Sequence, residues 1–333
     1  MDKLIGPDSL PTFMITLDDI RAAQARLQGV TVHTRLIEYK LSESDPRRLF
    51  LKPENQQPIG AFKLRGAYNK IASLSEPDRK RGVISYSSGN HAQGVAYAAR
   101  ALGVKAVIVM PNNAPAIKRL ATASLGAEIV LVGPGSDERK TKAEELAAEH
   151  GYVMVPPYAD KHIIAGQGTI GLEILEDLPG VETVLAPVGG GGMISGVAAA
   201  VKLSKPTVKV IGVEPALAAD AQASLRAGKI VQLPAEQVSR TLADGLRTQS
   251  VGSINFEHIQ RFVDDIIAVT EGEIRQAMRL LAANPKTIAE PSGAVAVAGF
   301  LFRRAELPQT IVNVAIISGG NIEPSMLEEI RRD

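Results

Sequence analysis

The feature that most constrains the fold of this chain is a regular alternation of short apolar runs with alanine-rich segments of helical character. Runs such as KAVIVMP (105–111) and KVIGVEP (209–215) are rich in β-branched residues, which predicts strands buried on both faces of a parallel sheet. Segments such as HAQGVAYAARALG (91–103), which ends on a glycine, predict the connecting helices. The alternation as a whole predicts a doubly wound α/β architecture.

Two irregular stretches interrupt this alternation, SLSEPDRKRG (73–82) and PPYADKH (156–162). The block between them has the size of a small domain. We therefore expect a small domain at 82–157, inserted into a large domain formed by 1–81 and 158–333. The 333 residues of the chain are enough for two such αβα domains.

The composition argues against several classes of protein. The net charge of +1 gives no electrostatic reason to bind nucleic acid, and no apolar run is long enough to cross a membrane. The segment MDKLIGPDSLPTF (1–13) lacks the apolar core of a signal peptide, so we expect a cytoplasmic protein. The chain has no cysteine, which excludes disulfides, thiol catalysis and cysteine zinc sites.

Three polar, glycine-containing loops follow predicted strands: SSGNH (87–91), GGGG (189–192) and SGGN (318–321). Ligands of open α/β sheets bind at the carboxyl ends of strands, where such loops lie. Four successive glycines before a helix leave backbone N–H groups free to surround an anion, and the helix dipole adds positive charge. A tight turn would need only one or two glycines, so we predict a site for a phosphate monoester.

Other motifs give weaker indications. GQGTIG (166–171) matches the dinucleotide-binding pattern, but the preceding DKHII is a poor strand and no acidic residue follows in the required context. We interpret it as the start of a helix whose small residues allow close packing. The G-x-S-x-G and H-E-x-x-H motifs are absent from the sequence.

In GAFKLRGAYNK (60–70), Lys63 lies between two apolar residues and two positions before Arg65. On this segment alone an ordinary solvated lysine is the commoner case. The alternative is a reactive amine, because desolvation and a nearby cation both lower the pKa of a lysine from about 10.4. Such an amine can attack a carbonyl and form a Schiff base.

A lysine beside glycines, a backbone phosphate site and two further polar loops are what a pyridoxal-phosphate site needs. The sequence resembles the fold-type II pyridoxal-phosphate enzymes, which share the fold of the tryptophan synthase β-subunit, and within them the serine/threonine dehydratase (threonine ammonia-lyase) and serine racemase group. The resemblance runs from Asp18 to Asn321. It rests on motifs in the family's order, namely GAFKLRGA, SSGNHAQG, GQGTIGLEI, VGGGGM, GVEP, TLADGL, AEPSGA and SGGN.

The resemblance implies a role toward pyridoxal 5'-phosphate for each matched residue. Lys63 would form the Schiff base with the cofactor aldehyde, and Phe62 would lie beside the ring. Asn90 would contact the ring hydroxyl and Ser318 the ring nitrogen. The backbone that holds the phosphate would be that of Gly189, Gly190, Gly191, Gly192 and Met193.

The resemblance also implies a substrate site and a metal site. The SSGNH loop would receive the substrate carboxylate, and Ser88 matches the acid/base residue on the face of the cofactor opposite the lysine. Glu214, the carbonyl of Ala218 and Asp220 match a divalent-cation site of the racemase-like members. Oxygen ligands alone suit Mg²⁺ or Ca²⁺. The alternative for the two carboxylates is a solvated helix start.

Some features depart from the family's pattern. Ala61 stands where many members have serine, and the form of PPYADKH leaves open whether Tyr158 is a neighbour of the cofactor. The chain ends soon after SGGN, so we expect no C-terminal regulatory domain. We expect a homodimer, because the resemblance implies one and AVAVAGFLF (294–302) is an apolar helix that the large domain could offer to a partner.

The activity implied by the resemblance is α,β-elimination. Lys63, displaced by the substrate amine, would remove the α-proton, and a neutral ring nitrogen at Ser318 would favour loss of a β-hydroxyl over transamination. L-threonine would give 2-oxobutanoate and ammonia, and L-serine would give pyruvate and ammonia.

Three alternatives to this activity stay open. One is a serine racemase that uses Lys63 and Ser88 on opposite faces. Another is a dehydratase for a different hydroxy amino acid, such as 3-hydroxyaspartate or a hydroxyectoine breakdown product. The third is a catalytically silent ligand-binding protein, against which the retention of Lys63 and of every cofactor loop argues.

Overall fold

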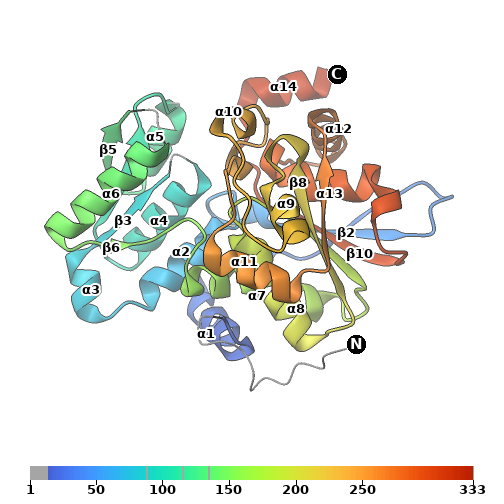
Figure 1. Ribbon diagram of the computed structural model, residues 1–333, viewed down its shortest axis with the longest axis horizontal. Helices are drawn as coiled ribbons and strands as arrows, with labels where there is room; N and C mark the ends of the chain where they lie inside the picture. The colour runs from blue at the N-terminus through green and yellow to red at the C-terminus, as the bar shows by residue number, and fades with distance from the viewer. Residues whose placement is uncertain (1–13, 88, 115, 134–135, 333) are drawn as a thin grey trace.

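The computed structural model describes residues 14–87, 89–114, 116–133 and 136–332. Its strands form a six-stranded sheet in the order β1-β2-β10-β7-β8-β9 and a four-stranded sheet in the order β5-β4-β3-β6. Neighbouring strands run parallel, except that β1 and β2 are antiparallel. Helices surround both sheets (Figure 1). The predicted α/β class with parallel sheets is confirmed.

The six-stranded sheet consists of β1 (Ile37–Tyr39), β2 (Arg48–Pro53), β7 (Thr183–Pro187), β8 (Lys209–Pro215), β9 (Asp265–Val269) and β10 (Val312–Ile317). The four-stranded sheet consists of β3 (Val83–Tyr86), β4 (Ala106–Pro111), β5 (Glu128–Val132) and β6 (Val153–Met154). The helices are α1 (Leu17–Leu27), α2 (Lys63–Ala72), α3 (Glu76–Arg81), α4 (Asn90–Ala101), α5 (Ala116–Ser124), α6 (Ser136–His150), α7 (Lys161–Asp177), α8 (Gly192–Ser204), α9 (Asp220–Ala227), α10 (Ala235–Val238), α11 (Ser253–Phe262), α12 (Glu271–Leu281), α13 (Pro291–Phe302) and α14 (Pro324–Arg332). The 3₁₀ turns are η2 (Glu54–Gln56), η3 (Ala216–Ala218), η4 (Asp244–Leu246), η5 (Pro285–Thr287) and η6 (Arg304–Glu306). No helix of the described chain has the length and apolar character needed to cross a lipid bilayer.

The four-stranded sheet and helices α3 to α6 form one body, on the left of Figure 1, and the six-stranded sheet lies within the other. The four strands of the smaller sheet all fall inside 82–157. The hydrophobic core around that sheet, however, also contains Leu64 and Ile71 of α2 and Ile163 of α7. The apolar interior therefore continues past both ends of 82–157, and the domain boundaries stay a prediction.

The apolar runs form strands that are covered on both faces. Every residue of β4 and of β7 is buried, as expected for the interior of a parallel sheet between helices. Strands β1, β2 and β9 were not predicted from the sequence. Strand β2 carries Arg48 and Lys52, and β9 begins at Asp265, so neither has the uninterrupted apolar pattern that marks the other strands.

The interpretation of GQGTIG as a helix start is wrong, although its packing role is confirmed. The motif lies inside α7, which begins at Lys161 and is capped by the Asp160 side chain. The glycines allow other helices to approach. A Cβ on Gly166 would lie only 2.6 Å from the carbonyl oxygen of Arg65, so a larger residue would push α2 away from α7.

The expectation that AVAVAGFLF offers an apolar surface to a second chain is also wrong. The segment forms most of α13, and its residues as far as Phe300 are buried. They belong to the hydrophobic core on one face of the six-stranded sheet. This helix therefore stabilises the interior of a single chain. The homodimer stays a prediction, without the support of this segment.

A cluster of buried ionic side chains joins α2 to α7 and to the region of β2. Arg65 donates from Nε to Glu54 Oε2 and from Nη1 to Glu173 Oε1, both at 2.7 Å. Lys52 Nζ donates to Glu173 Oε2 at 2.5 Å. All four side chains are buried, and their two positive and two negative charges balance. The cluster fixes the position of α2, whose first residue is Lys63.

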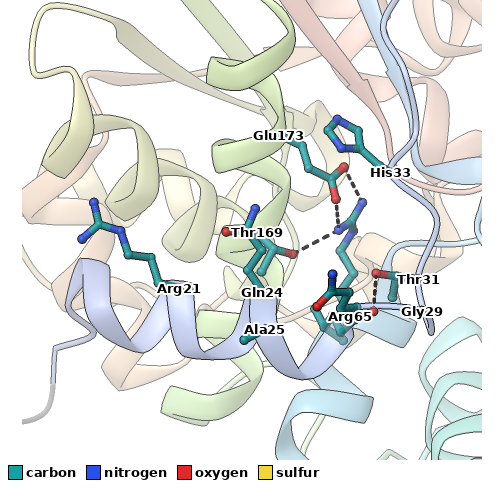
Figure 2. Close-up of a pocket in the computed structure, with 11 residues that line it drawn as sticks. Arg21, Gln24, Ala25, Gly29, Thr31, His33, Arg65, Thr169 and Glu173 are labelled. Atoms are coloured by element: carbon teal, nitrogen blue, oxygen red, sulfur yellow. Dashed lines mark hydrogen bonds and ion pairs between the residues drawn. The ribbon is translucent and has the colours of Figure 1, made fainter.

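A groove of about 500 Å³ opens over this cluster, between α1 and α7. Figure 2 shows Arg65 pointing toward Glu173 and Thr169, with Arg21 and Gln24 on the neighbouring helix α1. The buried charges at the base of the groove are thus already paired. None of the residues predicted to hold the phosphate or the cofactor lines this groove.

We expect Glu173→Gln to lower the free energy of unfolding by about 3–5 kcal/mol, because it leaves Lys52 and part of Arg65 buried without a balancing charge. Urea denaturation followed by circular dichroism measures this change. Glu176→Gln, one turn further along α7 and exposed, is the matched control, with an expected change below about 0.5 kcal/mol. Equal effects of the two substitutions would contradict the importance of the cluster.

Candidate active site

A second cavity has a volume of about 290 Å³. It is lined by residues from both bodies, the one with the four-stranded sheet and the one with the six-stranded sheet. Its walls include the loops that follow β3, β7 and β10 and the start of α2. The structure brings most of the residues singled out from the sequence into this one cavity. Those that line it are Phe62, Lys63, Asn90, Gly189, Gly190, Gly191, Gly192, Met193 and Ser318.

Lys63 is the first residue of α2, and its amine lies within the cavity. Its Nζ donates to the carbonyl oxygen of Pro157 at 2.8 Å and lies 5.1 Å from the centre of the Phe62 ring. Burial lowers the pKa of the Lys63 amine to about 8. Arg65, expected to help lower this pKa, does not contribute, because it is neutralised by the carboxylates of the ionic cluster. Roughly a tenth of such an amine is neutral at pH 7, compared with well under a thousandth for an ordinary lysine.

The four-glycine loop leads directly into α8. Gly191 has φ of 92°, in the left-handed region, and α8 begins at Gly192. Within the described residues, the N–H groups of 189–191 donate to no backbone carbonyl. A Cβ on Gly190 would lie 2.3 Å from the ring of Tyr158, so only glycine fits there. Free N–H groups at a helix N-terminus are suited to a phosphate.

Asn90 is held by two other polar side chains. Its Nδ2 donates to Glu290 Oε1 at 2.6 Å, and its Oδ1 accepts from Asn321 Nδ2 at 2.7 Å. Burial, and to a lesser degree the Asp244 carboxylate, raises the pKa of Glu290 to about 7. No role was predicted from the sequence for Glu290 or Asn321. Their presence in the matched motifs AEPSGA and SGGN was the signal that could have identified them.

The loop SSGNH contributes to the same wall of the cavity. Ser88, the predicted acid/base residue, lies outside the described residues. The N–H of Gly89 donates to Ser87 Oγ at 3.3 Å. The His91 ring Nε2 lies 3.0 Å from the carbonyl oxygen of Val155. Burial, and secondarily the charge of the cavity lysine, lowers the pKa of His91 to about 3, so this ring is neutral near pH 7.

Glu214 and Asp220 lie outside the cavity, at opposite ends of the short turn η3, and both are buried. The oxygens of Glu214 accept the N–H groups of Ala221 at 3.0 Å and Gln222 at 2.8 Å. Both carboxylate oxygens of Asp220 are buried and without a hydrogen-bond partner among the described residues. The burial of both side chains rules out the solvated helix start.

The surroundings of these two carboxylates disfavour their negative charges. Burial raises the pKa of Glu214 well above its usual value, and the neighbouring Asp220 raises it further. Burial also raises the pKa of Asp220 to about 7. The described residues contain no group of three or more His, Cys, Asp and Glu side chains placed to hold a metal ion. A hard cation here would therefore need further oxygen ligands, and the buried Ala218 lies between the two carboxylates in sequence.

Several charged residues that line the cavity were not identified from the sequence. Lys118 of α5 forms an ion pair with Asp244, in which the Nζ and Oδ2 atoms lie 2.8 Å apart. This pair joins the body of the four-stranded sheet to the body of the six-stranded sheet. Arg139 of α6 also lines the cavity, and its Nε is buried without a hydrogen-bond partner in the described part of the chain. Arg139 lies in a segment whose charged sequence resembles that of a solvated helix.

The groups in the cavity fit pyridoxal phosphate. The glycine loop offers free N–H groups to a phosphate, and Lys63 offers an amine of lowered pKa. Asn90 lines the cavity with its amide, and Ser318 lines it with a hydroxyl. This hydroxyl donates a long hydrogen bond of 3.3 Å to the Ser292 carbonyl oxygen. Tyr158, whose place was left open by the sequence, packs on the glycine loop.

Two curated proteins illustrate what this chain is similar to. It is 48% identical over 319 residues to the L-threonine ammonia-lyase of Thermotoga maritima, a match that covers 95% of this chain and 78% of that protein. It is 40% identical over 309 residues to the L-threo-3-hydroxyaspartate ammonia-lyase of Saccharomyces cerevisiae, covering 92% of this chain and 94% of that protein.

Solved structures of enzymes from the same group are also similar to this chain. The T.th. threonine deaminase matches with a TM-score of 0.87 and 43% identity over 93% of this chain and 99% of that one. Maize serine racemase matches with a TM-score of 0.89 and 36% identity, covering 94% and 96%. Residues 29–319 match the family described as pyridoxal-phosphate dependent enzyme. The chain therefore belongs to the pyridoxal-phosphate dependent enzymes, in the fold-type II group that includes threonine ammonia-lyases and serine racemases.

Proposed function

We propose that this protein is an ammonia-lyase that converts L-threonine and L-serine to the 2-oxo acid and ammonia. The observation that carries the proposal is Lys63, an amine whose pKa is lowered to about 8, in the same cavity as the unbonded N–H groups of the glycine loop. The identity to an L-threonine ammonia-lyase along nearly the whole chain supports this activity.

The cavity residues would hold the cofactor in a defined way. The N–H groups of 189–191 would bind its phosphate, Asn90 would donate to its ring hydroxyl, and Ser318 would meet its ring nitrogen. Bound pyridoxal phosphate supplies a carbonyl that reacts with amines and a ring that accepts electrons. A serine hydroxyl does not hold a proton on the ring nitrogen as a carboxylate would, which favours elimination over transamination.

The chain itself supplies the proton transfers of the elimination. The neutral Lys63 amine would take the α-proton of the substrate, and the ammonium group so formed would return a proton to the β-hydroxyl, which would leave as water. The Pro157 carbonyl, which accepts from Nζ at 2.8 Å, orients this amine. A racemase would need a second group on the opposite face of the cofactor, and Ser88 is the residue that the family pattern offers for it.

We expect the protein to release 2-oxo acid from L-threonine and L-serine faster than it racemises serine. Lys63→Ala should lower turnover by at least about 10²-fold, because it removes the base. After borohydride reduction and denaturation, cofactor absorbance should stay with the parent chain and not with this variant. Assays of 2-oxo acid and of both enantiomers measure the two activities.

The matched control for this substitution is Lys70→Ala, on the same helix α2, where Nζ pairs with Asp160 outside the cavity. We expect it to keep the cofactor and most of the activity. Racemisation faster than 2-oxo acid formation would reverse the ranking of the two activities. Full turnover in Lys63→Ala would remove the basis of the proposal.

A second candidate substrate is L-threo-3-hydroxyaspartate, and Arg139 is the observation that favours it. This guanidinium lines the cavity, and its buried Nε has no partner among the described residues. A substrate with a side-chain carboxylate would provide one. The identity to the 3-hydroxyaspartate ammonia-lyase of Saccharomyces cerevisiae supports the same candidate.

We expect Arg139→Gln to lower kcat/KM for L-threo-3-hydroxyaspartate at least about tenfold more than kcat/KM for L-threonine, since only the first substrate carries a second carboxylate. Arg247→Gln is the matched control, because that side chain also lines the cavity but donates to the Thr241 carbonyl. Equal losses for both substrates would show that Arg139 does not select for the side-chain carboxylate.

We also propose that Glu214, the Ala218 carbonyl and Asp220 bind Mg²⁺ or Ca²⁺, and that the protein is a homodimer. The cation would neutralise two buried carboxylates, of which Asp220 has no hydrogen-bond partner within the described chain. Such oxygen ligands are those that both ions prefer. The homodimer rests on the family resemblance, and light scattering at micromolar concentration tests it.

We expect millimolar Mg²⁺ or Ca²⁺ to raise the Tm of the parent protein by about 5 °C, as for a ligand present at about 100 times its Kd. Asp220→Asn should remove most of this shift, because it removes one ligand charge. Asp265→Asn, an exposed carboxylate in β9, is the control that should keep the shift. A cation effect that survives in Asp220→Asn would contradict this site.

A further inference from the structure

A series of hydrogen-bonded side chains connects the backbone just before Lys63 to the cavity. Asn321 Nδ2 donates both to the Ile59 carbonyl, at 2.9 Å, and to Asn90 Oδ1, at 2.7 Å. Asn90 Nδ2 donates in turn to Glu290 Oε1 at 2.6 Å. The series starts at a backbone carbonyl and ends at a carboxylate that is buried.

The two ends of this series determine which way each amide points. The Ile59 carbonyl only accepts hydrogen bonds, so the NH₂ group of Asn321 must face it. The same NH₂ group then faces the oxygen of Asn90, and the Asn90 NH₂ faces Glu290. If the Asn90 amide were turned over, its NH₂ would meet that of Asn321 and its oxygen would meet a carboxylate. The second N–H of Asn90 has no acceptor among the described residues, and Asn90 lines the cavity.

Two glycines leave space for this series of hydrogen-bonded side chains. A Cβ on Gly60, whose φ is 72°, would lie 2.4 Å from Asn321 Oδ1. A Cβ on Gly319 would lie 2.2 Å from Glu290 Oε1 and 3.2 Å from Asn90 Nδ2. Both glycines come from motifs that carry the family resemblance. Their lack of a side chain is therefore explained by the space that these three polar residues occupy.

We propose that Glu290 and Asn321 are positioning residues that hold the Asn90 amide with one N–H directed to the cofactor ring. The proposal rests on the role of Asn90 given under Proposed function. It assigns to Asn321 a donor role and to Glu290 an acceptor role, neither of which involves contact with the substrate. The ring oxygen is conjugated with the reactive end of the cofactor, so this N–H would influence both cofactor affinity and visible absorbance.

Two isosteric substitutions separate this role from space filling. Glu290→Gln keeps an oxygen that accepts a hydrogen bond from Asn90. We therefore expect the cofactor Kd to stay within about twofold of the parent value, and the visible absorbance band to stay within a few nanometres of its parent position. Asn321→Asp replaces the donor with an oxygen that faces the Ile59 carbonyl and Asn90 Oδ1. We expect it to raise the cofactor Kd about tenfold or more and to shift the band, as the loss of a hydrogen bond predicts.

The measurement is titration of cofactor-free protein with pyridoxal phosphate, followed by absorbance and fluorescence. Asn90→Ala gives the full effect of losing the amide, and Glu290→Ala should approach it. Asn313→Ala, a buried amide at the other end of β10, and Glu273→Gln, a carboxylate that caps α12, are controls for folding and should leave the band unchanged. If Asn321→Asp does not fold, Asn321→Ala replaces it.

The outcomes distinguish this inference from the proposed site. A parent-like Kd and band in Asn90→Ala would show that Asn90 does not contact the cofactor, and both proposals about it would fail. An effect of Asn90→Ala without one of Asn321→Asp or Glu290→Ala would overturn the positioning role alone. Equal damage from Glu290→Gln and Glu290→Ala would show that the carboxylate charge matters rather than the acceptor, which also overturns it.

Discussion

The buried guanidinium of Arg65 is the interaction on which the geometry of the active site depends. A buried charge is tolerated only when it is fully paired, so Glu54 and Glu173 must both stay within hydrogen-bond distance. They lie on η2 and α7, and Arg65 lies on α2. Their pairing therefore fixes the start of α2 relative to two other parts of the fold. Lys63, two residues before Arg65, takes its position in the cavity from this constraint.

The two cationic residues at the start of α2 have different roles because their surroundings differ. Residues two apart on a helix point in different directions, so Arg65 reaches the carboxylates while Lys63 faces the cavity. Burial alone would lower the pKa of Arg65, but the two carboxylates outweigh it and raise this pKa above its usual value, which keeps Arg65 charged. Burial without a carboxylate lowers the pKa of Lys63 to about 8. One helix thus carries a cation that holds the fold and an amine that is available to react.

The sequence predicted those parts of the molecule whose signal is local. The apolar runs became strands, and the loops after β7 and β10 came together because the carboxyl ends of neighbouring parallel strands meet. The loop after β3 belongs to the other sheet, and it reaches the same cavity only because the two bodies pack together. Strand β2 was missed because Lys52 looks like a surface residue until Glu173, far along the chain, pairs with it. Helix α13 was misread because an apolar helix can cover a sheet as well as a partner. Glu290 and Asn321 lie in matched motifs, but these motifs do not show that both residues contact Asn90.

Two polar contacts between the two bodies differ in how far they are shielded from water. Asn90 is tied to Glu290 and Asn321 by short bonds deep in the cavity, where Glu290 is 5% exposed. Lys118 and Asp244 form another link, but their side chains are 24% and 42% exposed. An exposed ion pair contributes about 1 kcal/mol or less and is screened by salt. Of these two contacts, the pair of Lys118 and Asp244 is therefore the weaker one, and the bonds of Asn90 are the ones that hold its amide in place at low and high salt alike.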